Sequence, residues 1–141
     1  MSSDLEKINT FIKKHHVLTL ATADGSELSA CSLFYAYSKE LKSFIVASSD
    51  DTTHIQHILK NNKIAGNILL ETSLIGKIQG LQFQGKVEVL QENELSKLYF
   101  KSFPQALVMN PKLWQIKVSY FKMTDNTLGF GKKTIWQDSS L

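Results

Sequence analysis

The side chains best suited to bind an anion are concentrated in the run SSDDTTH, residues 48–54, between an expected strand and an expected helix. Backbone N–H groups and the positive end of the helix dipole favour an anion at a helix N-terminus. The hydroxyls of this run can donate hydrogen bonds to a phosphate, and His54 can add a charge-assisted one. The alternative is that Asp51 or Thr52 only caps the helix. Asp50 and Asp51 favour that alternative unless their carboxylates point away.

Three glutamines of a later expected strand, Gln79, Gln82 and Gln84, form a second candidate group. Strand alternation places Gln79 on the same face as Leu81 and Phe83, and it places Gln82 and Gln84 on the opposite face. A glutamine amide both donates and accepts hydrogen bonds, so it can match the mixed polar edge of a planar heterocycle such as a flavin. The alternative is that these glutamines only face solvent.

The four histidines do not form a recognisable metal site. His54 and His57 are three residues apart and could share a helix face, but no carboxylate or cysteine completes a ligand set and no HExxH pattern occurs. We therefore predict no metal, and we favour surface or capping roles. The sequence also lacks GxSxG, P-loop and GxGxxG motifs. If the protein is an enzyme, a cofactor must supply the chemistry.

The elements that would position these residues are mostly strands in hairpin succession. A stripe of Leu5, Ile8, Phe11 and Ile12 predicts a first helix. Further helices are expected from Asp51 or Thr52 to about residue 61 and over 92–103. Strands are expected over 17–22, 28–37, 43–47, 64–70, 75–90, 114–124 and 134–136. This order predicts a mainly β (α+β) fold, an antiparallel sheet that closes into a small barrel.

The totals are those of one ordinary globular domain. The chain has 141 residues, 21% of them charged, and a formal net charge of +3. Lysines and glutamates alternate without forming a basic face, so a nucleic-acid partner is not expected. The single cysteine, Cys31, excludes an internal disulfide framework, fits a reducing cytoplasm and is expected to be a buried strand thiol. No stretch reaches the length of a membrane span, so no membrane partner is expected.

Five stretches carry a family resemblance over most of the chain after the first helix. They are VLTLATADG, LSACSLFYAYSKELKSFIVASSDDTTH, IAGNI, IQGLQFQGKVEVL and KMTDNTLGFGKKTIW. Their order and spacing resemble the FMN-binding split-barrel superfamily related to pyridoxamine 5′-phosphate oxidase, and most closely its YhbP-like branch. The resemblance implies a six-stranded antiparallel split β-barrel with short flanking helices, and an obligate homodimer with two cofactor sites at the interface.

The resemblance also implies a flavin site, with FMN as the cofactor. The residues at the position of the phosphate-binding segment are Ser48, Ser49, Thr52, Thr53 and His54. The strand segment 30–33, which includes Ser32, would line the isoalloxazine ring by its backbone, and Gln79 or Gln82 would address its polar edge. His54 stands where many relatives have lysine or arginine. The implied function is FMN binding over residues 1–141, either in an oxidoreductase whose substrate is not assigned or in a protein that only binds the flavin.

Two other classes stay open. The superfamily includes haem-degrading members, so the chain could bind haem, with His15, His16 or His57 as candidate axial ligands. It could also be a cofactor-free dimeric regulator or a nucleic-acid-binding barrel. An absorption spectrum separates flavin, haem and neither.

Overall fold

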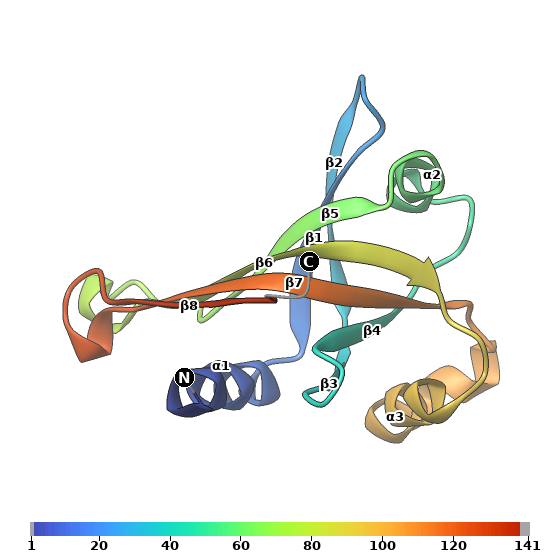
Figure 1. Cartoon of the computed structure of the whole chain (residues 1–141). Coiled ribbons are helices and arrows are strands. Elements are labelled where there is room, and N and C mark those ends of the chain that lie inside the picture. The colour runs from blue at the N-terminus through green and yellow to red at the C-terminus, as the bar shows by residue number, and fades with distance from the viewer. Residues whose placement is uncertain (1, 139–141) are drawn as a thin grey trace.

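Residues 2–138 are described by a computed structural model, in which one antiparallel sheet runs through most of the chain (Figure 1). Its strand order is β2-β1-β5-β6-β7-β4-β3, and β8 pairs with β7. The strands are β1 (Val17–Ala23), β2 (Leu28–Phe34), β3 (Ala36–Ser38), β4 (Ser43–Ala47), β5 (Lys63–Leu69), β6 (Gln79–Val89), β7 (Leu113–Asp125) and β8 (Lys133–Gln137). Because β2 also contacts β4, the two ends of the sheet approach each other and the sheet curls into an incomplete barrel. The predicted fold class is confirmed.

The structure has eight strands where the resemblance implied six. The expected strand 28–37 is divided at Tyr35, because Tyr35 and Ala36 are both buried and the inside–outside alternation is broken there. The Tyr35 hydroxyl donates a hydrogen bond to the carbonyl oxygen of Ile12, 2.5 Å away, which holds the bend against the first helix. The chain therefore leaves β1 at this point and pairs with β4 as β3.

Three helices flank the sheet, together with short turns of 3₁₀ helix. The helices are α1 (Ser2–Lys14), α2 (Thr53–Lys60) and α3 (Glu94–Ser102), and the turns are η1 (Ile75–Lys77), η2 (Pro104–Met109) and η3 (Asn126–Leu128). Thr52 caps α2, since its side chain accepts a hydrogen bond from the Ile55 N–H. Figure 1 shows α2 beside the projecting β1–β2 hairpin. None of the described helices is long and apolar enough to cross a membrane.

The main core lies on the inner face of the sheet, where aromatic rings meet. The ring centroids of Phe44 and Phe83 are 4.8 Å apart, and those of Phe44 and Phe121 are 6.3 Å apart. Ile8, Phe11 and Ile12 of α1 pack into this core, as their spacing predicted. Cys31 packs against it and is half-buried. On the other face of β4, Ile45 packs with Leu95 and Tyr99 of α3 in a second buried cluster. On β6 the outer face carries exposed Gln82, Gln84 and Lys86.

Candidate functional site

The helix-start segment, residues 48–54, uses most of its hydroxyls within itself. The Ser48 hydroxyl lies 2.5 Å from His54 Nε2. The Thr52 hydroxyl donates to the Ser49 carbonyl oxygen at 2.8 Å, and the Ser49 hydroxyl donates to the Asp51 carboxylate at 2.6 Å. The Thr52 side-chain oxygen also accepts a hydrogen bond from the Ile55 N–H, which confirms the capping role of Thr52. Four of the five predicted phosphate-binding side chains, all except Thr53, therefore already have hydrogen-bond partners in the chain.

Thr53 and Asp50 complete the helix-start segment. The Thr53 side chain is exposed and makes no hydrogen bond within residues 2–138, so its hydroxyl is available to a ligand. Lys112 Nζ lies 3.0 Å from Asp50 Oδ1, and Gln56 donates to the Asp50 carbonyl oxygen at 2.5 Å. The Asp50 carboxylate is thus paired with a lysine, which reduces its repulsion of an anion.

His54 is the one titratable group of the helix-start segment that is buried, with 8% of its surface exposed. Burial lowers the pKa of His54 below its ordinary value, and the nearby His57 lowers it further. The imidazole is therefore neutral near pH 7. An anion placed against it would favour the protonated form and would raise this pKa.

Strand β2, which carries Ser32, contacts the elements on both sides of the helix-start segment. Helix α2 contacts β1 and β2, and β2 also contacts β4, the strand that leads into the segment. The Ser32 side chain lies on the exposed face of β2. The predicted ring-binding strand and the predicted phosphate-binding segment are therefore adjacent elements, although no hydrogen bond joins Ser32 to the segment.

The two candidate glutamines lie on opposite faces of the sheet, as alternation predicted. Gln79 is held on the inner face, where its amide donates to Asp125 Oδ2 at 3.1 Å. Gln82 is exposed on the outer face. It shares a cross-strand row with Ser32, with Thr19 and Asn67 between them. The structure therefore brings Ser32 and Gln82 to one face and separates Gln79 from both.

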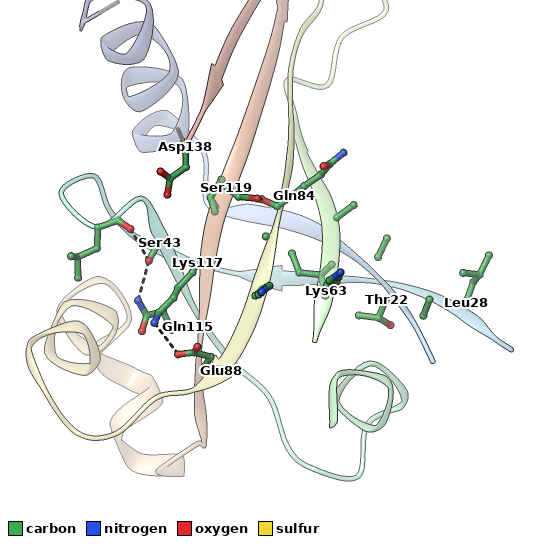
Figure 2. A pocket seen from close by; sticks show the side chains of 18 residues that line it. Thr22, Leu28, Ser43, Lys63, Gln84, Glu88, Gln115, Lys117, Ser119 and Asp138 are labelled. Atoms are coloured by element: carbon green, nitrogen blue, oxygen red, sulfur yellow. Dashed lines mark hydrogen bonds and ion pairs between the residues drawn. The ribbon is translucent and has the colours of Figure 1, made fainter. Parts of the chain in front are cut away.

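The outer face also holds a cavity of about 820 Å³ that the sequence did not reveal (Figure 2). Its lining combines alanines and leucines with three lysines and Gln84, all from strands or their connections. No residue of the helix-start segment lines it. The lining residues come from distant parts of the chain and meet only through the cross-strand register, so no local sequence motif could have predicted the cavity.

A second group that sequence reasoning missed joins α2 to the β1–β2 hairpin. His57 is buried, with Nδ1 2.9 Å from the Thr22 hydroxyl and Nε2 4.0 Å from Asp24 Oδ2. The ligand atoms of Asp24, Glu27 and His57 lie within 4.8 Å of one another, close enough for a metal ion to bridge. However, Lys60 Nζ lies 3.9 Å from Asp24 and supplies the positive charge there. The group acts as a tie between helix and hairpin.

The Asp24 carboxylate also organises the hairpin turn itself. It accepts hydrogen bonds from the backbone N–H groups of Ser26 at 2.9 Å and Glu27 at 2.8 Å. These bonds lower the pKa of Asp24 to about 2. The Asp24-Gly25 pair thus forms the turn through a charged acceptor, and Gly25 supplies the positive φ of 103°.

The candidate haem ligands are divided between two places. His15 and His16 line a second cavity of about 850 Å³, which Tyr35, Tyr37 and Phe103 also line. Burial lowers the pKa of His15, with smaller contributions from the neighbouring His16 and Lys14, so the His15 imidazole is neutral and able to bind a metal. His57 lies elsewhere, in the tie between α2 and the hairpin.

The curled antiparallel sheet with short flanking helices defines a split-barrel protein. Residues 5–122 match the family model described as Pyridoxamine 5′-phosphate oxidase. The chain is also 36% identical over 135 residues to a UPF0306 protein of Cronobacter sakazakii, with 94% of each chain covered. It therefore belongs to the pyridoxamine 5′-phosphate oxidase family, as the sequence motifs indicated.

Solved structures of split-barrel proteins share the fold at low sequence identity. A heme binding protein from Mycobacterium smegmatis has a TM-score of 0.78 and 15% identity, over 95% of this chain and 57% of that one. A FAD-binding protein from Mesorhizobium loti has a TM-score of 0.68 and 16% identity, over 83% of this chain and 91% of that one. At such identities the similarity establishes the fold alone.

Proposed function

We propose that residues 1–141 form a single FMN-binding domain, that two copies make a homodimer, and that the protein is a cytoplasmic flavin-dependent oxidoreductase. The family binds flavin, and a structural neighbour binds FAD. The observation on which the proposal rests is that β2, the predicted ring-binding strand, contacts both α2 and β4, the two elements that flank the helix-start segment. A ring along β2 and a phosphate at the start of α2 would then belong to one molecule.

The chain's own residues would divide the work as follows. The phosphate would receive hydrogen bonds from the Thr53 hydroxyl and from the first backbone N–H groups of α2. Ser48, Ser49 and Thr52 would exchange internal hydrogen bonds for bonds to the phosphate, and His54 would hold a proton against it. Bound flavin supplies electron transfer. Of the two glutamines, Gln82 is the better candidate for the ring edge, because its side chain is exposed and bonded to no described residue, whereas Gln79 is bound to Asp125.

The homodimer is proposed because the single chain leaves large apolar side chains in water. Phe34 of β2 is 59% exposed, and Val17, opposite it on β1, is 42% exposed. Leu107, Val108 and Met109 are exposed together in η2. A monomer seldom leaves such apolar surface uncovered, and a second copy would cover it.

Titration with FMN and riboflavin, followed by flavin fluorescence, tests the phosphate role. We expect FMN to bind more tightly, because interaction with a helix terminus contributes about 0.3–1 kcal/mol when exposed and up to about 2 kcal/mol when partly buried. Equal affinities would remove the helix-start segment from the site. Failure of both flavins to bind would refute the proposed function and favour the cofactor-free class.

The pH dependence of FMN affinity tests His54 separately. If His54 binds the phosphate, its pKa rises in the complex, so affinity is greater below that raised pKa and is lost as pH climbs through it. The second ionisation of the phosphate, near pH ~6, opposes this trend at the acid end, so an optimum near neutral pH is expected. His54→Gln should abolish the optimum. An unchanged affinity profile in that variant would show that His54 does not touch the phosphate.

Haem binding is the second candidate, favoured by the two histidines in the 850 Å³ cavity and by the heme-binding neighbour. Addition of haem to the purified protein, followed by absorption spectroscopy, tests it. Coordination by histidine would shift the Soret band, and His15→Ala or His16→Ala would remove the shift. A spectrum equal to that of free haem would exclude this candidate.

A further inference from the structure

Three lysines lie side by side across the outer face of the sheet, one on each of three adjacent strands. The register pairs Lys63 of β5 with Lys86 of β6, and it pairs Lys86 with Lys117 of β7. All three line the cavity of about 820 Å³, and Figure 2 shows it from close by. We call these residues the lysine row.

The lysine row is unfavourable for a sheet on its own. Side chains directly opposite each other have Cβ atoms about 4.5–5.5 Å apart, and like charges in such positions destabilise the pair. Lys117 Nζ binds Glu88 Oε2 at 3.0 Å, but Lys63 and Lys86 have no ion pair within residues 2–138. Asp138 also lines the cavity, and Figure 2 shows it on the side away from Lys63. Two neighbouring ammonium groups therefore lack a counter-ion.

The surface beside the lysine row is apolar and small. Ala21 of β1 lies opposite Ala65 of β5, which lies opposite Gln84 of β6. Methyl groups leave room above the sheet, and the Gln84 amide can donate or accept one hydrogen bond. The cavity volume falls within the range of about 300–1,000 Å³ that is usual for sites of small ligands.

A β-bulge shapes this part of the cavity. The register between β6 and β7 shifts between Gln84 and Gly85, and a Cβ on Gly85 would overlap the Lys117 carbonyl oxygen. The Ser119 hydroxyl, on the bulged strand, donates to the Gln84 carbonyl oxygen at 3.3 Å. Bulges commonly re-aim side chains beside binding sites. Here Gln84 and Lys86 are both exposed on either side of the glycine.

We propose that this cavity binds a small acidic molecule, one with a carboxylate or phosphate group on a compact apolar body. The acidic group binds Lys63 and Lys86 and supplies the missing counter-charge, while the apolar body lies on Ala21 and Ala65. The cavity shares no lining residue with the proposed flavin site, although the row of Ala21, Ala65 and Gln84 lies next to the row that joins Ser32 to Gln82. The inference therefore stands whether or not the protein binds flavin.

Isothermal titration with phenyl phosphate, benzoate and benzyl alcohol tests the proposal on the intact protein. We expect at least one of the two acids to bind, and the comparison between them decides between phosphate and carboxylate. Benzyl alcohol, which is neutral, should not bind measurably. Lys86→Gln should weaken binding of the acid about tenfold, since a hydrogen bond to a charged group is lost. Lys86→Arg should retain most of the affinity.

Lys101→Gln is the matched control, because Lys101 is exposed on α3 and its replacement changes the net charge equally. It should leave the affinity unchanged. The proposal is overturned if no acid binds, if benzyl alcohol binds as well as the acids, or if Lys86→Gln has no effect. An equal loss of affinity in Lys101→Gln would also overturn the proposal. So would a Lys86→Gln variant that binds the acid normally but sediments at a different mass, because the lysine row would then serve contact between subunits.

Discussion

The helix-start segment and the lysine row differ in how far the protein satisfies its own polar groups. In the segment, Ser48 is bound to His54 and Thr52 caps α2, so a ligand must replace existing hydrogen bonds. In the lysine row, Lys63 and Lys86 lie opposite each other, and neither has an ion pair with any residue that the structure describes. The polar groups of the helix-start segment therefore bond mainly to one another, whereas two ammonium groups of the lysine row remain available to a ligand.

This difference shows two ways in which polar side chains gather. The residues of the segment are neighbours in the sequence, and neighbours of this kind often bond to one another as caps and turns. The lysines come from three separate strands and meet only through register. Register can bring partners together, as it does for Gln79 and Asp125, but it gives Lys63 and Lys86 no partner within residues 2–138, so their charges remain available to a ligand.

The largest expected effect is on the bulge that supports the lysine row. Gly85→Ala forces a Cβ against the Lys117 carbonyl oxygen, and overpacking of this kind costs about 1–3 kcal/mol, or more where backbone must move. Urea denaturation measures the loss. Gly76→Ala is the control, because nothing lies within 4 Å of a Cβ at Gly76. Equal stability of the two variants would show that the bulge is not needed.

Removal of His54 should come next in size. His54→Ala deletes a buried ring and leaves the Ser48 hydroxyl without its partner, which costs about 1–3 kcal/mol. His16→Ala, at an exposed site, should stay within about 0.5 kcal/mol of the parent. If both variants unfold at the same urea concentration, the helix-start segment does not depend on His54 for its stability. The statement that this segment is held together by its own polar groups would then be wrong.

The pH dependence of the free energy of unfolding gives a second test of the role of buried His54. Because burial lowers the pKa of His54 in the folded state, the unfolded chain binds the proton more readily. Stability should therefore fall as pH drops below the unfolded value of ~6.5 and toward the lower folded pKa. The slope should be smaller in His54→Gln, with urea midpoints as the readout. A steeper slope in the variant would mean that folding raises this pKa.

The smallest expected effect is on the stability of the lysine row itself. Lys86→Gln removes a like charge from between Lys63 and Lys117, so it should stabilise the fold by about 0.2–1 kcal/mol. The urea midpoint should rise and the slope of the transition should stay constant. A destabilised variant would mean that Lys86 stabilises the folded sheet, and it would contradict the view that Lys86 is an uncompensated charge available to a ligand.

The sequence predicted the features that depend on local patterns. Alternation identified the strands, Asp24-Gly25 identified the hairpin, and Thr52 was one of two expected caps for α2. The break at Tyr35 was missed because it depends on a hydrogen bond to α1, a contact between separate elements. The tie between His57 and Asp24 and the lysine row were missed for the same reason.

Sedimentation velocity, monitored in the flavin absorption band with FMN added, tests the central proposal most directly. The account predicts that the flavin absorbance moves in one boundary at the mass of a dimer. His54→Gln and Lys101→Gln should both keep that mass, while His54→Gln leaves more of the flavin unbound. Flavin that stays in the slow boundary of free FMN, or that moves with a monomer, would contradict a flavin site formed between two copies of this chain.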